Sequence, residues 1–387
     1  MLGGLAVDDI RPALAGSGMG HVDAPTALVS GGGIPKSAPE TPLVVVVNDP
    51  DRATSTAPAL RAIREAAPDR PIHVVVATGS HVWSHAAREV HQGPLREAVG
   101  SPAWFSWHDG TAGIHADVGG ARLDEIVASA RDVLGIGSVE PHWFAGLTGA
   151  HKTLTVGVMH RDDIAENHAQ AISPGCRPFR LAGNPVHEGI VRVMSALAGG
   201  RHVRALQHAH NRWFSGPPLE SLADASKLAE ARWKRLVARP LDFAIAVVAP
   251  PLSRTLYQAE KGVKNCEFAI RDGGMIVLDA ECEDGVGPDR FVQMLRDAKD
   301  VAGVEAVLQR DGYRLGDHKA HRLRALQARG VRLAIVSTRL PREAAEAAGF
   351  TLHATRKDAA NVVRGAFGGS SRGAVIEDAG HVVVETA

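Results

Sequence analysis

The strongest constraint on the fold is a repeated pattern of short, uninterrupted apolar runs that are rich in β-branched residues. Longer stretches with the apolar spacing of amphipathic helices lie between them, for example at 57–68, 122–132 and 290–300. A strand that is apolar at every position is buried on both faces, which is typical of parallel sheets covered by helices. The alternation therefore predicts an α/β protein with mostly parallel sheets. The runs are LVVVV (43–47), IHVVVA (72–77), VLGIG (133–137), FAIAVVA (243–249), MIVLDA (275–280) and LAIVS (333–337).

The length of the chain predicts more than one domain. A domain usually holds about 100–200 residues, and this chain has 387. A turn-rich segment at 214–222 and a charged segment at 226–242 precede a fresh apolar run, which is typical of a boundary. We therefore predict an N-terminal α/β domain over 1–240 and a C-terminal α/β domain over 241–387. The first forty residues are expected to be irregular.

Composition excludes several classes of protein. The chain has 43 basic and 43 acidic residues, so its formal net charge gives no reason to expect a nucleic-acid or membrane-surface partner. The three cysteines form no CxxC pair, which argues against a disulfide framework and against a cysteine zinc site. No apolar run is long enough to cross a bilayer, and the first residues lack the pattern of a signal peptide. We expect a cytoplasmic protein.

Polar and ionisable residues follow three of the predicted strands at similar offsets. Ligands of open α/β sheets bind beyond the carboxyl ends of the strands. Taken singly, each of these residues has an ordinary explanation, such as a turn, a surface ion pair or a helix N-cap. Three sets at matching positions predict a functional site at this edge of the sheet. The residues are Asp49 and Arg52, then Thr78, Ser80 and His81, then Glu140 and His142.

Two common nucleotide motifs fail here. GLTGAHKT (146–153) nearly matches GxxxxGK[ST], but His151 takes the place of the second glycine, where a Cβ would obstruct a phosphate nest. No GxGxxG follows any strand. Two alternatives stay open on residue types alone. One is a zinc-dependent hydrolase that uses His81, His142 and His168, although HExxH is absent. The other is a non-catalytic nucleotide- or metal-binding protein.

Five segments together resemble the lactate racemase family of nickel-pincer-nucleotide enzymes. They are NDPDR (48–52), TGSH (78–81), EPHWFAGLTGAHK (140–152), ENH (166–168) and LYQAEK (256–261). The resemblance extends from about residue 43 to the C-terminus. It implies two α/β domains with the active site in the cleft between them. It also implies a racemase or epimerase that inverts C2 of a 2-hydroxy acid by proton-coupled hydride transfer.

The resemblance further implies a cofactor, partners and roles for individual residues. The cofactor is a nickel-pincer nucleotide, pyridinium-3,5-bisthiocarboxylic acid mononucleotide with bound nickel, and cofactor-synthesis enzymes are the expected partners. Two histidines are needed because a base on each side of C2 must both take and return a proton. The implied roles are catalysis for His81 and His142, covalent attachment for Lys152, nickel ligation for His168, cofactor binding for Asp49, Thr78, Gly79 and Ser80, and substrate binding for Arg52, Gln258 and Lys261.

The chain also departs from the family pattern near the expected pocket. His151 stands where relatives commonly carry arginine, and Trp143 is bulkier than the usual aromatic residue. Relatives act on other 2-hydroxy acids besides lactate. The resemblance therefore implies the reaction class and leaves the substrate open.

Overall fold

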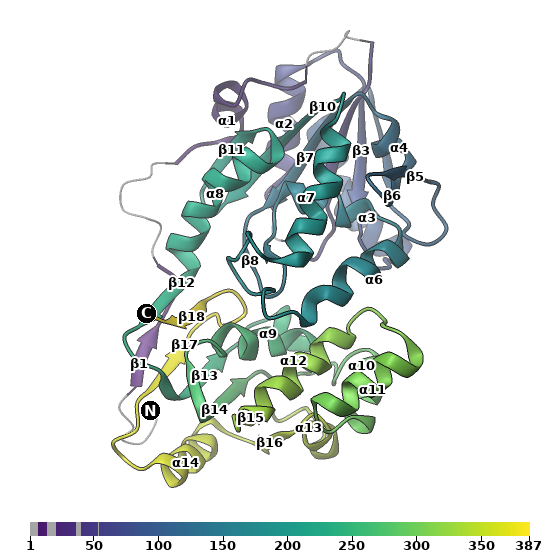
Figure 1. Cartoon of the computed structure of the whole chain (residues 1–387). Helices are drawn as coiled ribbons and strands as arrows, with labels where there is room; N and C mark the ends of the chain where they lie inside the picture. Colours follow the sequence, from purple (N-terminus) through teal and green to yellow (C-terminus); the bar gives the residue numbers. More distant parts are fainter. Residues whose placement is uncertain (1–6, 14–20, 36–39, 53) are drawn as a thin grey trace. The chain divides into compact units, whose positions relative to one another are not determined.

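The computed structural model describes residues 7–13, 21–35, 40–52 and 54–387. The chain divides into two compact units, which we describe separately. The N-terminal unit spans 15–231. The C-terminal unit combines 232–387 with the first fourteen residues of the chain. Each unit has a central six-stranded sheet covered by helices (Figure 1). Both sheets are mainly parallel, as the continuous apolar runs predict.

The sheet of the N-terminal unit has the order β11-β10-β7-β2-β3-β4, and its strand pairs are parallel except β10–β11. The chain starts the sheet at β2, continues outward through β3 and β4, and then returns to β7 on the other side of β2. This reversal is a topological switch point, the place where open α/β sheets bind ligands. The strands are β2 (Leu43–Asn48), β3 (Ile72–Ala77), β4 (Ala103–Trp107), β7 (Asp132–Ser138), β10 (His202–Ala209) and β11 (Arg212–Gly216).

Helices cover both faces of this sheet and bury its apolar side chains. Along β2, Val45 and Val47 are fully buried in a cluster that also holds Leu60 and Ile63 of α2. The helices are α1 (Ala24–Ser30), α2 (Thr56–Ala66), α3 (His85–Val99), α4 (Glu125–Ser129), α5 (Ala150–Thr153), α6 (Arg161–Ala169), α7 (Pro185–Ala198) and α8 (Pro218–Trp233). Two small antiparallel pairs complete the unit, β5 (His115–Val118) with β6 (Ala121–Asp124) and β8 (Pro141–His142) with β9 (Gly146–Leu147).

The sheet of the C-terminal unit is parallel throughout, in the order β1-β17-β13-β14-β15-β16. Its strands are β1 (Val7–Ile10), β13 (Leu241–Val247), β14 (Ile270–Asp279), β15 (Arg332–Val336), β16 (Phe350–His353) and β17 (Gly373–Ile376), and β12 (Lys234–Val237) pairs separately with β18 (Val383–Thr386). The helices are α9 (Leu256–Cys266), α10 (Asp289–Asp297), α11 (Val301–Asp311), α12 (Asp317–Ala328), α13 (Arg342–Ala347) and α14 (Arg356–Phe367).

Two local predictions are wrong. The first forty residues are not wholly irregular, since β1 and α1 lie within their described part. Residues 122–132 were expected to form one helix, but β6 ends at Asp124 and only the short α4 follows it. The two compact units divide the chain at 231/232, nine residues before the predicted 240/241. β1 is the edge strand beside β17, and β12 pairs with β18, so both belong to the C-terminal unit.

Among the residues that the structure describes, no helix has both the length and the apolar character needed to span a membrane.

Candidate functional site

A polar pocket lies at the carboxyl ends of β2 and β3 in the N-terminal unit, beside the switch point of the sheet. Its volume is about 120 Å³. In the parallel register, Asn48 lies opposite Ala77, so the chain leaves both strands at the same level of the sheet. The residues that follow them meet for this reason. The predicted site residues that line the pocket are Asp49, Arg52, Thr78, Gly79, Ser80, His81, Lys152 and His168.

His81 and Asp49 form a hydrogen-bonded pair in this pocket. The Nδ1 atom of His81 lies 2.8 Å from Oδ2 of Asp49, and Oδ2 of Asp51 lies further away at 3.6 Å. The Asp49 side chain is 6% exposed and that of His81 is 43% exposed. A carboxylate at Nδ1 holds the ring proton there, which leaves Nε2 to act as a base. Gly79, at φ +56°, makes the turn that places His81 after β3.

His142 lies next to Lys152. The Nε2 atom of His142 is 3.0 Å from Nζ of Lys152, while the Ala145 N–H donates to its Nδ1 at 3.2 Å. Because Nδ1 accepts, a neutral His142 ring carries its proton on Nε2. That proton can be donated to Lys152 only if the lysine is an uncharged amine. The geometry thus suits a lysine that acts as a nucleophile.

Glycines allow the short helix that carries Lys152 to approach the sheet. A Cβ on Gly137 would lie 2.5 Å from the backbone nitrogen of Ala150, and Gly149 has φ +146°. The Ala150 N–H donates to Oε1 of Gln207 at 2.8 Å, which fixes the start of α5. This close packing explains why small residues precede the lysine.

His151 is buried away from the pocket that its neighbour lines. The side chain is fully buried, and neither ring nitrogen has a hydrogen-bond partner among the described residues. Its ring lies 5.4 Å from that of His187. Burial lowers the pKa of His151 well below its usual value. The replacement of the usual arginine by His151 therefore changes the interior of the unit, and His151 is not among the residues that line the pocket.

His168 enters the pocket from α6. Its Nδ1 lies 3.1 Å from Oδ1 of Asn167, and the ring of Phe144 packs edge-on at 4.8 Å. Burial, together with the nearby Lys152, lowers the pKa of His168 to about 3. The ring is therefore neutral at physiological pH, which is the state in which imidazole binds a metal.

The turn after β3 differs from the helix start that we predicted as a phosphate site. Helix α3 begins at His85 and is capped by Ser84, not by Ser80. The Gly79 N–H donates to the carbonyl of Gly157 at 2.9 Å, and the His81 N–H donates to that of Thr78 at 2.9 Å. Thr78, Gly79 and Ser80 line the pocket, but two of the backbone donors in this turn are used inside the protein.

Gln258 and Lys261 belong to α9 of the C-terminal unit. Thr255 caps this helix and accepts the Gln258 N–H at 3.3 Å. Both side chains are partly exposed and lie three residues apart on the helix. Their part in binding a substrate stays a prediction.

The zinc alternative requires at least three protein ligands that converge on one point. Within the described residues, no group of three or more histidine, cysteine, aspartate or glutamate side chains is arranged to hold a metal ion. His81, His142 and His168 are therefore not a zinc site. A single imidazole such as His168 can hold a metal only if a second molecule supplies the other ligands.

Sequence reasoning missed His108, which follows β4 much as His81 follows β3. The His108 ring is buried, and its Nδ1 lies 3.1 Å from Oγ1 of Thr78. The signal in the sequence is the pair His108–Asp109 after the run AWFSW (103–107). All five residues of β4 are partly or fully exposed, which hides the periodicity expected of a buried strand.

The fold and the pocket define an α/β protein with a polar pocket at the switch point of its N-terminal sheet. Residues 35–177 match the lactate racemase N-terminal domain, and 239–383 match the lactate racemase C-terminal domain. Together the two matches cover most of the chain, which therefore belongs to the lactate racemase family.

Two relatives carry the name lactate racemase. The one from Thermoanaerobacterium thermosaccharolyticum is 26% identical over 194 residues, which cover 47% of this chain and 44% of that protein. The one from Lactiplantibacillus plantarum is 27% identical over 254 residues, which cover 62% and 59%. The chain thus matches about half the length of these relatives.

Two solved structures have a similar fold. The lactate racemase apoprotein from Thermoanaerobacterium thermosaccharolyticum superposes with a TM-score of 0.82 at 19% identity, covering 98% of this chain and 95% of that one. A protein from Thermotoga maritima gives a TM-score of 0.67 at 14% identity, covering 97% and 100%. At these identities the likeness concerns the fold alone.

Proposed function

We propose that this protein is a racemase or epimerase that inverts C2 of a 2-hydroxy acid with a nickel-pincer nucleotide as cofactor. The observation that carries the proposal is the convergence of four separate family segments on one pocket. They bring together the Asp49–His81 pair, the amine of Lys152 and the neutral ring of His168.

The pocket residues fit the cofactor by their chemistry. Lys152 offers an amine, adjacent to His142, that can form the covalent link. His168 offers one neutral imidazole, and the sulfur-bearing arms of the nucleotide would supply further nickel ligands. The pocket, at about 120 Å³, is smaller than the roughly 300–1,000 Å³ of most ligand pockets. A pocket of this size would hold only part of such a nucleotide, beside Lys152 and His168.

When bound, the cofactor supplies the acceptor for the hydride that leaves C2 of the substrate. The chain itself moves the hydroxyl proton. His81 is suited to take it, because Asp49 fixes the ring proton on Nδ1 and stabilises the imidazolium that forms. The family resemblance makes His142 the second acid–base residue; its ring lies beside Lys152 and is not among the residues that line the pocket. Arg52 lines the same pocket and can pair with the substrate carboxylate.

Trp143 gives no guide to the substrate. Its side chain is 3% exposed and is not among the residues that line the pocket. Its greater bulk is absorbed by the interior of the unit. The reaction class is therefore proposed for 2-hydroxy acids in general, with the cofactor supplied by synthesis enzymes of the host.

The test is to produce the chain together with cofactor-synthesis enzymes, and to measure its intact mass and nickel content. We expect an added mass on the Lys152 peptide and about one nickel per chain. A Lys152→Arg variant, which keeps a long basic side chain and cannot form the link, should lack the added mass. Loaded protein should then interconvert the two C2 isomers of at least one member of a panel of 2-hydroxy acids. Chiral chromatography measures this interconversion.

A deuterium label on C2 of the substrate distinguishes this mechanism from simple proton abstraction. With a substrate deuterated at C2, hydride transfer through the cofactor keeps the deuterium in the product. Loss of the deuterium to water would contradict the proposed mechanism. Absence of both adduct and nickel would contradict the roles proposed for Lys152 and His168.

A further inference from the structure

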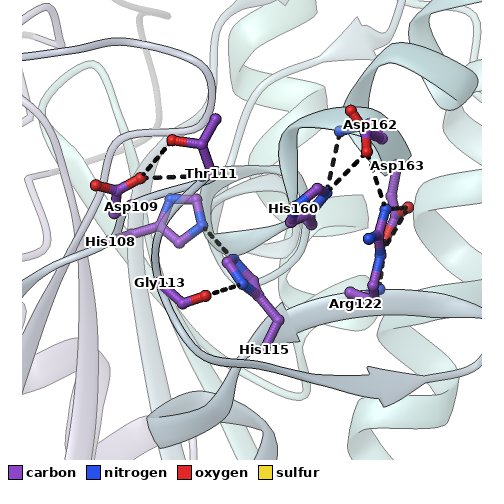
Figure 2. Close-up of polar contacts among 9 residues, drawn as sticks. All are labelled: His108, Asp109, Thr111, Gly113, His115, Arg122, His160, Asp162 and Asp163. Atoms are coloured by element: carbon purple, nitrogen blue, oxygen red, sulfur yellow. Dashed lines mark hydrogen bonds and ion pairs between the residues drawn. The ribbon is translucent and has the colours of Figure 1, made fainter.

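Three histidines lie together beside the pocket turn, and none of them has a role in the proposed reaction. Figure 2 shows His108, His115 and His160 with their polar neighbours. The Nε2 atoms of His108 and His115 are 3.4 Å apart, and the rings of His115 and His160 meet edge-on at 5.1 Å. His108 is 2% exposed and reaches the pocket wall through Thr78. The cluster therefore lies directly behind a residue that lines the pocket.

The hydrogen-bond partners assign a proton to each ring. His115 Nδ1 lies 2.7 Å from the carbonyl oxygen of Gly113, which can only accept, so Nδ1 carries the proton. In a neutral ring, Nε2 of His115 is then an acceptor. Nε2 of His108 lies 3.4 Å from this acceptor, and two facing lone pairs would repel each other, so the His108 proton is assigned to Nε2. Nδ1 of His108 is left as an acceptor that faces Oγ1 of Thr78 at 3.1 Å.

This order fixes the direction of the Thr78 hydroxyl. A threonine hydroxyl has one proton and two lone pairs. The Thr78 hydroxyl donates to the carbonyl oxygen of His108 at 3.0 Å, and Nδ1 of the same residue, an acceptor in this tautomer, lies on the same side of Oγ1 at 3.1 Å. The proton therefore points to His108. If it pointed into the pocket, the lone pairs of Oγ1 and Nδ1 would face each other in a buried place, which is unfavourable.

The charged groups around the cluster do not change this assignment of protons to His115, His108 and Thr78. The Asp109 carboxylate accepts hydrogen bonds from the N–H groups of Thr111 and Ala112, which lowers its pKa to about 2. The carboxylate is thus hydrogen-bonded within its own loop. The Asp124 carboxylate interacts electrostatically with His115. Asp124 also caps α4. Asp162 and Asp163 pair with Arg122, next to His160.

The remaining neighbour is His160, which caps α6. Its Nδ1 accepts the Asp162 N–H at 3.3 Å. Burial is the main cause that lowers the pKa of His108 to about 4, with His115 and His160 adding to it. The His108 ring is thus neutral at pH 7, as the assigned order requires.

We propose that His108 is a positioning residue which, with its proton fixed by His115, makes Thr78 face the pocket as a hydrogen-bond acceptor. Its ligand partner is then a hydroxyl donor, such as a ribose hydroxyl of a bound nucleotide, and not a phosphate oxygen. An anion at Thr78 requires a proton on Nδ1 of His108, which in turn requires a positively charged His115. The identity of the ligand rests on the proposed function, whereas the order of protons concerns the chain alone.

The test is NMR of protein labelled with ¹⁵N at histidine, without cofactor, near pH 7. Ring nitrogen shifts distinguish the two neutral tautomers, and His108→Gln and His115→Gln variants assign the signals. We expect the proton on Nε2 in His108 and on Nδ1 in His115. A proton on Nδ1 of His108, or a charged His115, overturns the proposal. This result does not depend on whether the chain is a racemase.

Matched variants test the coupling between the rings. His115→Phe removes the acceptor and should shift His108 toward the Nδ1 tautomer. His160→Asn removes a ring that also touches His115 but keeps a capping side chain for α6, so it should leave the His108 tautomer unchanged. An equal shift in both variants would overturn the assignment to the His108–His115 contact.

Two ligand measurements complete the test. Inorganic phosphate added to the unliganded protein should leave both tautomers as they are, and a switch of His108 to the Nδ1 tautomer would contradict an acceptor at Thr78. In a Lys152→Arg background, where no covalent link can form, Thr78→Val should lower the retained fraction of cofactor roughly fivefold, the equivalent of about one hydrogen bond, while Thr78→Ser retains it. Equal retention in Thr78→Val would show that no ligand group bonds to this hydroxyl.

Discussion

Asp49 and His81 leave neighbouring parallel strands at the same level and meet through a 2.8 Å hydrogen bond between Oδ2 and Nδ1. The carboxylate is buried, and the imidazole is partly exposed to the pocket. This is the arrangement by which a carboxylate fixes the tautomer of a catalytic histidine and stabilises its charged form. The pair gives His81 a defined basic atom, Nε2, on the side away from Asp49.

Asp49→Asn should therefore lower kcat strongly while leaving the fold intact. An amide at this position can donate to Nδ1 and stabilise the wrong tautomer, and a comparable change in a serine protease reduces kcat about 10⁴-fold. We expect a loss of roughly 10²–10⁴ in C2 inversion by loaded protein. Circular dichroism and the nickel content should remain those of the unchanged protein.

Asp51→Asn is the matched control. Its Oδ2 is 3.6 Å from Nδ1 of His81, and its side chain is 53% exposed. An exposed ion pair of this kind contributes at most about 1 kcal/mol, so activity should fall by no more than a few-fold. Equal losses of activity in the two variants would mean that the negative charge near His81 matters, and not the hydrogen bond with Asp49.

The sequence predicts the sheets well because their central strands are buried on both faces. All six apolar runs are strands, and two of them deliver Asp49 and His81 to one edge. β1 could not be predicted in the same way. Its sequence, VDDI, has two exposed aspartates because it forms the edge of its sheet, and its partner β17 lies more than three hundred residues further on.

The site is predicted less completely than the sheet. Motifs identify residues such as Lys152 and His168, because the same residue types recur at fixed spacing. A motif does not state which atom of a ring accepts a hydrogen bond. Thr78 and His108 are thirty residues apart, and their contact depends on the pairing of β3 with β4. Only the three-dimensional arrangement assigns the proton between them.

His168→Gln should abolish nickel retention in protein produced with the cofactor-synthesis enzymes. Glutamine preserves much of the volume but replaces a neutral imidazole with a weak ligand. The control is His208→Gln, which changes another histidine whose pKa is lowered by burial. His208 packs on Trp213 and is not among the residues that line the pocket. Elemental analysis should find about one nickel per chain in the control and much less in His168→Gln.

Arg70 and Asp132 form a buried ion pair at the opposite end of the N-terminal sheet from the pocket. Asp132 keeps His202 as a partner at 2.9 Å, but removing Arg70 takes away the cation paired with this buried carboxylate, and breaking a buried ion pair costs about 3–5 kcal/mol. Arg70→Met should therefore lower the free energy of unfolding by this amount in urea titrations. Lys227→Met, which breaks an exposed pair with Asp224 on α8, should change it by less than about 1 kcal/mol.

His151→Met should make the protein less sensitive to acid. The pKa of His151 is lowered well below its ordinary 6.5 by burial, so the folded ring stays neutral while the unfolded one takes up a proton below that pH. Since the unfolded state then binds more protons, stability falls as the pH drops from 6.5, by about 1.4 kcal/mol per pH unit for one such group. Methionine is apolar and adaptable, and it removes this titration together with two buried ring nitrogens that lack partners.

The expected result is a difference that grows as the pH falls. Urea titrations at pH 7 should give similar or slightly higher stability for His151→Met than for the unchanged protein. At pH 5 the variant should be more stable by roughly 2 kcal/mol, because it has lost one of the histidines whose protonation favours unfolding. His168 and His108 also have lowered pKa values, so both curves still slope downward toward acid pH. Parallel curves from pH 7 to pH 5 would mean that His151 takes up its proton equally in the folded and unfolded states, and that its ring is not excluded from water.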